Sequence, residues 1–262
     1  METMERTRSL IDSERIGSKF SKACSTYNRS AIAQRKIADR LALLLRDYME
    51  QSSFYPYSAL EIGCGTGLLT RHLQQLCPSA WWTLNDLYSA CAEKALSFCR
   101  QGTRFVCADA SEVDWNESFQ LIASSSVFQW IPNQKAFYKR LAACQKEGDV
   151  LLFSSFLPGN FSEIYQLTHQ GLLNPDRNDL KSWLEPYYQI QTFMADEIRL
   201  YFPSPKDVLL HLKETGVTAN HSGFWTPGRF RTFSDAYYEH FSNEQQQVSL
   251  TYKPVYVLAV KK

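Results

Sequence analysis

The sequence predicts an α/β fold: a mostly parallel, doubly wound sheet with an N-terminal helical lid and a cap inserted after the fifth strand. Five short apolar runs alternate with helical segments between residues 58 and 156. Polar side chains stand at the ends of these runs, which is where open α/β sheets bind ligands. The first run leads into a turn with glycine at positions 63, 65 and 67, a pattern typical of a strand, a tight turn and a helix.

The glycine-rich turn predicts a cofactor site. Gly63, Gly65 and Gly67 allow a sharp turn and a close ligand approach, and we expect backbone N–H groups and the following helix to point their positive ends at the ligand. The dinucleotide pattern G-x-G-x-x-G is not met, because Leu68 stands where its third glycine would be. With Glu61 two residues earlier, the pattern E-x-G-x-G-x-G resembles the first motif of class I S-adenosylmethionine-dependent methyltransferases. An NAD(P) site and a structural turn are the alternatives.

Periodicity predicts the remaining elements of the core. Apolar residues recur at three- and four-residue steps over residues 16–49, which indicates two helices with a break near 27–30. A helix at 68–77 follows the glycine turn. Further helices are expected at 89–100 and 133–145, and further strands at 81–85, 104–108, 119–124 and 150–156.

The rhythm of strands and helices stops after residue 156. Residues 157–195 are rich in aromatic residues and broken by loops, with helical patches near 162–173 and 179–187. A strand is expected at 197–202, a helix at 205–215 between Ser204 and Gly216, another helix at 231–241, and a final edge strand at 247–261. The chain is therefore divided into a lid (1–50), a cofactor-binding core (58–156), a cap (157–195) and a C-terminal part of the core (196–262), all in one domain.

Four polar residues fall at or just beyond strand ends. They are Glu61, Asp86, Asp109 and Ser124. Asp86 lies 19 residues beyond Gly67, near the spacing at which nucleotide-binding folds place a carboxylate on ribose hydroxyls. Because the carboxyl ends of parallel strands meet at one edge, these four side chains predict a cofactor site more readily than four independent helix caps.

Composition excludes several classes of protein. The net charge of +1 argues against a nucleic-acid binder. The seven cysteines include no C-x-x-C pair, so neither a disulfide framework nor a zinc site is expected. No apolar run reaches membrane-spanning length, and the polar N-terminus lacks a signal peptide. We therefore expect a cytoplasmic protein without a metal or membrane partner, with a monomer as the expected state.

Over nearly its whole length the chain resembles the malonyl-[acyl-carrier protein] O-methyltransferases of biotin synthesis. The N-terminal pattern is F-x(6)-Y-x(6)-Q at 20–34, followed by LEIGCGTG-x-LT at 60–70. The blocks NDL (85–87), ADA (108–110) and LIASS (121–125) come next, and then the Gln129-Trp130 pair. The late blocks are L-x-x-L-K-x-x-G-V at 209–217 and LTY at 250–252. The resemblance implies a Rossmann-like class I methyltransferase fold.

The resemblance also implies an activity and its residues. A methyl group would pass from S-adenosylmethionine to the free carboxylate of a malonyl thioester on acyl-carrier protein, giving a methyl ester that is extended toward pimelate. Glu61 and the glycine turn would bind the methionine part, Asp86 the ribose, and Asp109 with Ala110 the adenine, while Tyr27 and Gln34 would close the lid. The implied cofactor-binding residues are Tyr27, Gln34, Glu61, Gly63, Gly65, Gly67, Asp86, Leu87, Asp109, Ala110 and Ser124.

For the acceptor, the chemistry requires orientation and no general base, because carboxyl groups titrate near ~4 and are ionised at neutral pH. We expect no catalytic acid–base residue, and none follows the fourth strand. Gln129 and Trp130 are the expected substrate-binding residues after that strand. A bidentate arginine suits a carboxylate, and Arg199 and Arg229 are the candidates, with Arg231 a further one. The basic residues of 1–40, or Lys206 and Lys213, would attract the acidic carrier.

Two other functions remain open from the sequence. A small-molecule carboxyl methyltransferase of the trans-aconitate type would share the fold and cofactor and would methylate a free acid. A non-catalytic S-adenosylmethionine-binding protein would use the same binding residues. A nucleic-acid methyltransferase is disfavoured, because residues 124–130 contain no D/N-P-P-Y motif.

Overall fold

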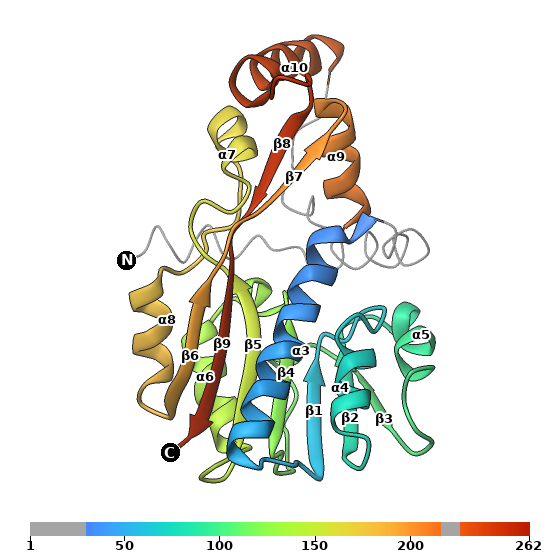
Figure 1. The fold of residues 1–262 in the computed structure, drawn as a ribbon, viewed down its shortest axis with the longest axis vertical. Helices are drawn as coiled ribbons and strands as arrows, with labels where there is room; N and C mark the ends of the chain where they lie inside the picture. Colours follow the sequence, from blue (N-terminus) through green and yellow to red (C-terminus); the bar gives the residue numbers. More distant parts are fainter. Residues whose placement is uncertain (1–29, 216–225) are drawn as a thin grey trace.

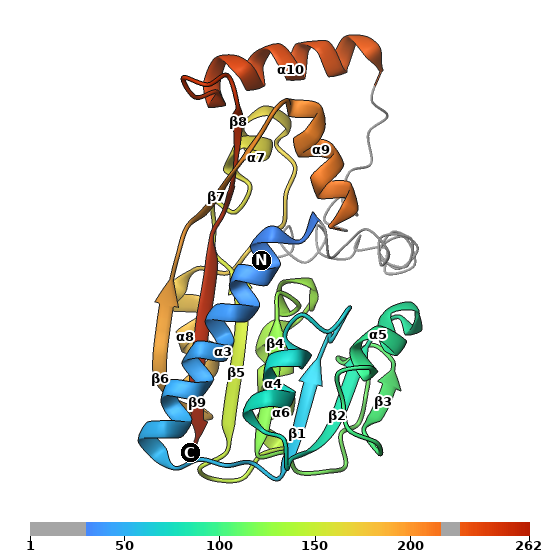
Figure 2. The same cartoon turned by 45° about the vertical axis from the view of Figure 1, so that its right-hand side comes forward.

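The computed structural model describes residues 30–215 and 226–262. Their main feature is a seven-stranded sheet with the strand order β3-β2-β1-β4-β5-β9-β6, accompanied by a separate two-stranded sheet of β7 and β8. Figures 1 and 2 show the larger sheet in the lower part of the molecule and the smaller one extending beyond its upper end. The fold class expected from the sequence is confirmed.

The first five strands pair in parallel, as expected of a doubly wound sheet. Their carboxyl ends therefore lie at one edge, the upper one in Figure 1. The strands of the large sheet are β1 (Ser58–Ile62), β2 (Trp81–Asp86), β3 (Arg104–Cys107), β4 (Leu121–Ser125), β5 (Val150–Phe156), β6 (Tyr188–Ala195) and β9 (Pro254–Lys261).

Helices cover both faces of this sheet. Residues of α3 and α4 pack into one apolar cluster with strand residues such as Leu121 and Ala123, while α6 and α8 pack into a second cluster with Leu60 and Ile62. The helical elements are α3 (Ile32–Ser52), α4 (Thr70–Leu76), η1 (Ser89–Cys91), α5 (Ala92–Leu96), η2 (Phe128–Trp130), α6 (Gln134–Ala143), α7 (Ser162–Thr168), α8 (Arg177–Leu184), α9 (Pro205–Glu214) and α10 (Pro227–Phe241).

The C-terminal strand differs from the expectation. We expected one edge strand over residues 247–261, but the structure has two strands there, β8 (Val248–Tyr252) and β9. The prediction of an edge position is wrong, because β9 lies between β5 and β6 and is antiparallel to both. The alternation of residue types is the same for an edge strand and an inner strand, so the pattern alone did not distinguish the two.

The extra structure after β5 also differs from the expected segment 157–195. Within that range, α7 belongs to the upper part of the molecule, whereas β6 is the edge strand of the large sheet. The upper lobe, as we call it, consists of α7, α9, α10 and the sheet of β7 (Ile198–Phe202) and β8. Its core is continuous with that of the large sheet, because one apolar cluster includes residues from α3 through α10.

Candidate functional site

The glycine turn joins β1 to α4 and is tied to the end of β2. The N–H groups of Gly63 and Cys64 donate to the carbonyl oxygen of Asn85, at 2.8 and 2.9 Å. The N–H of Gly65 donates to Oδ2 of Asp86 at 2.7 Å. These N–H groups therefore point at β2, contrary to the expectation that they point at a ligand. The neighbouring strand sets the shape of the turn.

Each glycine of the turn has a different reason to lack a side chain. A Cβ on Gly63 would meet Cγ2 of Val127 at 2.2 Å, and a Cβ on Gly67 would meet Phe98 at 2.8 Å. At Gly65 no atom would lie within 4 Å of the Cβ, although the φ of +49° favours glycine. Open space therefore adjoins the turn at Gly65, as a ligand-binding turn requires.

Glu61 is a buried carboxyl group one strand residue away from the turn. It is 1% exposed, and its Oε2 has no hydrogen-bond partner among the described residues. Burial raises the pKa of Glu61 to about 8, the nearby Thr70 hydroxyl acts against this rise, and the charge of Asp86 acts in the same direction as burial. A cation placed beside this carboxyl group would favour its ionised form. Glu61 therefore suits a ligand with a positively charged group.

Asp86 is the last residue of β2, as expected. Its Oδ2 accepts from Gly65, and its Oδ1 accepts from the N–H of Tyr88 at 3.0 Å. Burial raises its pKa, and these backbone hydrogen bonds lower it. Each carboxylate oxygen can accept a further hydrogen bond, so Asp86 can bind hydroxyl groups while it maintains the turn. Leu87 follows and is partly exposed.

Asp109 lies just beyond the end of β3 and Ser124 near the end of β4, with β2 and β1 between these two strands in the sheet. Asp109 Oδ1 accepts from the N–H and Oγ of Ser111, at 2.8 and 2.7 Å, and Ala110 beside it is buried. Ser124 is fully buried in β4, and its Oγ donates to the carbonyl oxygen of Ile62 at 2.8 Å. Ser124 therefore connects β4 with β1. Its cofactor-binding role remains a prediction.

The lid residues are described in part. Tyr27 lies outside the described residues. Gln34 lies in the first turns of α3, is buried, and has no partner for its Oε1 among the described residues. On the same helix, Asp39 contacts His72 of α4 at 2.8 Å. α3 and α4 run in the same direction (Figure 1). Because Gln34 is more than one turn closer to the start of α3 than Asp39, it lies toward the glycine-turn end of α4.

The expected substrate residues do not gather at one place. Gln129 and Trp130 lie in η2, just after β4. Arg199 lies on β7, where its Nη2 contacts Glu197 at 2.8 Å, and Arg229 is exposed at the start of α10. No contact described in the structure joins either arginine to the glycine turn. Their role in binding the carboxylate stays a prediction.

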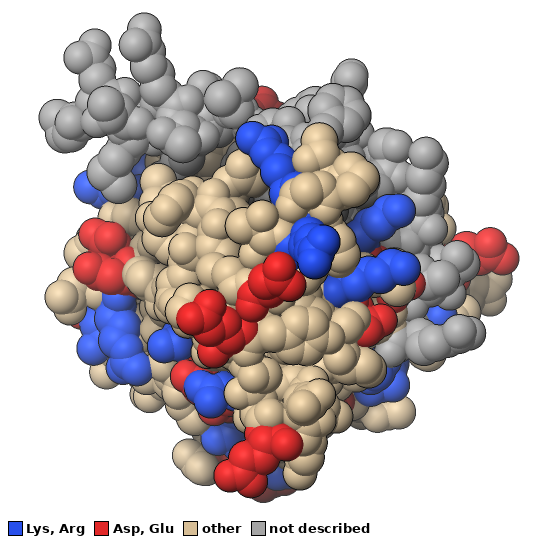
Figure 3. Space-filling model, turned by 90° about the horizontal axis from the view of Figure 1, so that it is seen from above, with Lys and Arg blue, Asp and Glu red and all other residues tan. Residues whose placement is uncertain are grey.

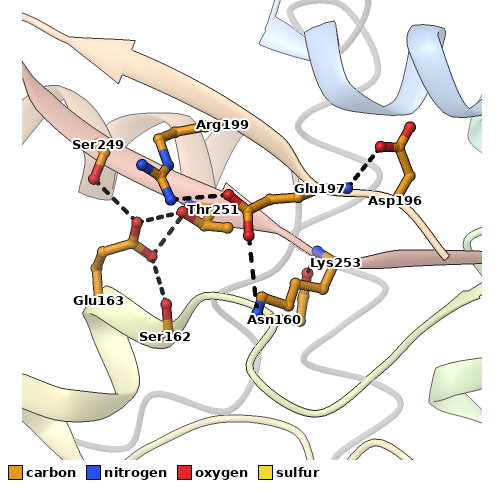
Figure 4. A network of polar contacts seen from close by, with 9 residues as sticks. All are labelled: Asn160, Ser162, Glu163, Asp196, Glu197, Arg199, Ser249, Thr251 and Lys253. Atoms are coloured by element: carbon orange, nitrogen blue, oxygen red, sulfur yellow. Dashed lines mark hydrogen bonds and ion pairs between the residues drawn. The ribbon is translucent and has the colours of Figure 1, made fainter. Parts of the chain in front are cut away.

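Arg199 instead lines a groove of about 450 Å³ in the upper lobe. Figure 4 shows its polar network, with Glu197 between Arg199 and Lys253. The buried carboxylate of Glu163 accepts from the N–H and Oγ1 of Thr251 and from Oγ of Ser249. The sequence did not predict this network. No spacing pattern could have predicted it, since Glu163 and Thr251 are 88 residues apart.

Two other features near the turn, one contact and one backbone conformation, were also not predicted. Val127 packs against Gly63, and Ser126, directly before it, has a φ of +59° although it is not glycine. A run of serines after a strand carries no signal for a left-handed residue. Neither position was therefore predicted to be special.

The described residues include neither a candidate metal site nor a membrane-spanning helix. Within residues 30–215 and 226–262, no group of three His, Cys, Asp or Glu side chains lies close enough to bind a metal ion. None of the helices in those ranges is long and apolar enough to cross a membrane.

Comparison with solved structures supports the fold. The plantazolicin methyltransferase BpumL, solved with S-adenosyl-L-homocysteine (SAH) and a desmethyl analogue, matches with a TM-score of 0.58, at 15% identity over 100% of this chain and 98% of that one. NodS, an N-methyltransferase from Bradyrhizobium japonicum solved with SAH, matches with a TM-score of 0.53, at 13% identity over 85% and 86%. At such identities the likeness concerns the fold alone.

Sequence comparison is more specific. The family described as "Methyltransferase domain" matches residues 59–148. A malonyl-[acyl-carrier protein] O-methyltransferase from Porphyromonas gingivalis is 38% identical, covering 95% of this chain and 96% of that protein. The protein of the same name from Haemophilus influenzae is 33% identical, covering 95% of each. The glycine turn, its two acids and these full-length similarities lead to one conclusion: the chain belongs to the malonyl-[acyl-carrier protein] O-methyltransferase family.

Proposed function

We propose that this protein transfers a methyl group from S-adenosylmethionine to the free carboxylate of malonyl-[acyl-carrier protein], the step that prepares the malonyl unit for pimelate formation in biotin synthesis. The observation that carries the proposal is the similarity to methyltransferases of this name over 95% of the chain. The geometry of the glycine turn supports the choice of cofactor, and the residues after β4 support the type of reaction.

The residues at the turn fit S-adenosylmethionine. Its ammonium group would compensate the buried carboxyl of Glu61, whose Oε2 lacks a partner among the described residues. Its ribose hydroxyls would donate to the remaining acceptor positions of Asp86. The open space beside Gly65 allows the ligand to lie against the turn. The cofactor supplies a methyl group activated by a positively charged sulfur.

The residues near the acceptor have a positioning task. Residues 126–130, which follow the fourth strand, contain no Asp, Glu, His, Lys or Cys that would serve as a general base. A malonyl carboxylate needs none, since it is ionised at neutral pH. Orientation of the carboxylate oxygen toward the methyl carbon is then the main contribution, and it lowers barriers by roughly 7–11 kcal/mol in well-aligned systems. Exclusion of water by neighbouring aromatic residues such as Trp130 would add to it.

An acidic carrier would dock through local positive charge. Lys206 and Lys213 of α9 and Arg229 and Arg231 of α10 are exposed. Both signs of charge are interspersed on the face seen in Figure 3, so docking would depend on individual cations and not on a broad basic field. We also propose a monomer in the cytoplasm, and the location is supported by the free thiols of the described cysteines, Cys64, Cys77, Cys99, Cys107 and Cys144.

The test is methyl transfer from labelled S-adenosylmethionine to malonyl-carrier, with succinyl-carrier, free malonate and trans-aconitate in parallel. We expect labelling of malonyl-carrier alone. Labelling of only a free acid would contradict the proposal and favour a small-molecule carboxyl methyltransferase. Cofactor binding by calorimetry without methylation of any acceptor would favour a non-catalytic binding protein.

A further inference from the structure

Ser126 has an unusual backbone, fixed from two sides. It is the first residue after β4, and its φ of +59° is rare for a residue with a side chain. Its N–H donates to the carbonyl oxygen of Ser154 at 3.2 Å and to Oγ of Ser154 at 3.0 Å. Its carbonyl oxygen accepts from Nε2 of Gln129 at 2.5 Å. The neighbouring strand and η2 therefore maintain the left-handed conformation.

The hydroxyl group of Ser126 is equally unusual. Its Oγ is shielded from water and has no hydrogen-bond partner among the described residues. A left-handed residue and an unpaired buried hydroxyl each disfavour the folded state. Both occur at the same residue. Such features cluster at functional sites, where the surrounding structure maintains them.

Ser126 also lies beside the cofactor turn. The next residue, Val127, packs so closely on Gly63 that a Cβ there would lie 2.2 Å from Val127 Cγ2. Two residues earlier, Ser124 donates to Ile62, the last residue of β1. Residues on both sides of Ser126 therefore contact the segment where β1 ends and the glycine turn begins, Ser124 at Ile62 and Val127 at Gly63.

We propose that Oγ of Ser126 donates a hydrogen bond to the carboxylate of the acceptor acid and orients it for methylation, an inference that rests on the proposed function. The segment 125–130 contains no cation, so a neutral donor is what this strand end offers. A neutral donor has a chemical advantage, because a tight ion pair would withdraw more charge from the attacking oxygen. One carboxylate oxygen accepts from Ser126, and the other stays free to attack the methyl carbon.

Ser126→Gly tests the proposal, because glycine adopts a φ of +59° without strain and removes the hydroxyl together with Cβ. We expect kcat/KM for malonyl-carrier to fall about 10- to 100-fold, as for the loss of one hydrogen bond to a charged group. The dissociation constant of S-adenosylmethionine, measured by calorimetry, should change less than twofold. Ser126→Ala removes the hydroxyl alone and keeps the Cβ at the same φ, so it should lose activity similarly without a loss of stability. Ser125→Ala, which removes the adjacent hydroxyl, is the control and should keep wild-type activity.

Each other outcome overturns the inference. A Ser126→Gly protein with wild-type kcat/KM would show that the hydroxyl does not contact the acceptor. Weakened cofactor binding that accounts for the whole loss would assign the hydroxyl to the carboxylate of the cofactor. If the wild-type protein bound cofactor and methylated no carrier, the proposed function would fail, and the inference that rests on it would fail with it. The wild-type assay therefore separates the two failures.

Discussion

Buried carboxyl groups at the cofactor turn can accept more hydrogen bonds than the described residues donate to them. Glu61 and Asp86 are both acids at strand ends, yet their surroundings differ. Asp86 accepts backbone hydrogen bonds on each of its two oxygens, whereas Oε2 of Glu61 has no partner among the described residues. Asp86 therefore contributes to the shape of the turn, while Glu61 lowers the stability of the ligand-free fold at neutral pH.

Glu61→Gln should change the pH dependence of stability. The pKa of Glu61 is about 8 in the folded protein and 4.5 ordinarily, so the folded state retains a proton that the unfolded state loses between these values. The contribution of Glu61 is fully present below pH 4.5 and is lost as pH rises toward 8. The free energy of unfolding should fall by up to about 1.4 kcal/mol per pH unit in this window.

Urea unfolding at pH 5, 6, 7 and 8 without cofactor measures this effect. The Glu61→Gln protein should show a flatter profile than the wild-type protein and should exceed it in stability near pH 8. Parallel profiles for the two proteins would contradict the raised pKa.

Asp86→Ala should weaken cofactor binding. The substitution removes acceptors for ribose hydroxyls and for the N–H of Gly65. Hydrogen bonds to charged groups contribute about 1.5–3 kcal/mol each, so the dissociation constant should rise roughly 10- to 100-fold by calorimetric titration. Asp114→Ala, at a carboxylate whose side chain is 91% exposed, is the control. Unchanged affinity in Asp86→Ala would remove Asp86 from the cofactor site.

At the scale of elements, neighbouring strands decide the form of the functional segments. The turn after β1 is fixed by β2 through Asn85 and Asp86, and the segment after β4 is fixed by β5 through Ser154. In the upper lobe, Glu163 of α7 joins that helix to β8. Each loop conformation thus depends on a second element that is distant in sequence.

Gly63→Ala should destabilise the protein more than Gly65→Ala. Both glycines have positive φ, so an alanine costs about 1–2 kcal/mol at either position. Only the Cβ at 63 would collide with Val127, which adds a further cost of about 1–3 kcal/mol. Adding Val127→Ala to Gly63→Ala should recover part of the loss. Equal losses of unfolding free energy in the two glycine variants would contradict the packing seen here.

Glu163→Ala should weaken the upper lobe. Its carboxylate is 3% exposed and accepts from Ser249 and Thr251, so its removal leaves buried donors unpaired. We expect the free energy of unfolding to fall by about 2–4 kcal/mol. Glu197→Ala, which removes half-exposed ion pairs, should cost at most about 1 kcal/mol. Similar losses in urea unfolding of the two variants would contradict this difference.

At the scale of the whole molecule, the two parts share one core. The apolar cluster that begins on α3 and the large sheet continues through β8 to Phe233 and Tyr237 of α10. The upper lobe extends beyond the sheet in Figure 2, yet it has no separate cluster of buried residues in the described part of the chain. We therefore expect the lobe and the sheet to unfold together.

Calorimetry tests this expectation. A single transition should appear, and SAH at about 100 times its dissociation constant should stabilise the protein by about 2.7 kcal/mol. For a chain of this size the melting temperature should rise by about 5–10 °C. Two transitions, of which only one shifts with the ligand, would contradict a shared core.

The sequence by itself determined the parts that depend on local pattern. The five parallel strands, the glycine turn and the strand-end position of Asp86 follow from periodicity and spacing within short windows, and the structure has each of them. Motifs spread over the full length also led to the correct family, through blocks such as Gln129-Trp130 and Leu250-Thr251-Tyr252.

The tertiary structure alone decided which distant segments meet. It placed β9 between β5 and β6 and brought Glu163 to Thr251. It also fixed Ser126 in the left-handed conformation, through hydrogen bonds with Ser154 and Gln129. It also placed Arg199 in a groove of the upper lobe. Strand pairing and buried hydrogen bonds are long-range interactions, and the free energy that selects among them depends on the packing of the whole chain and not on a local window of residues.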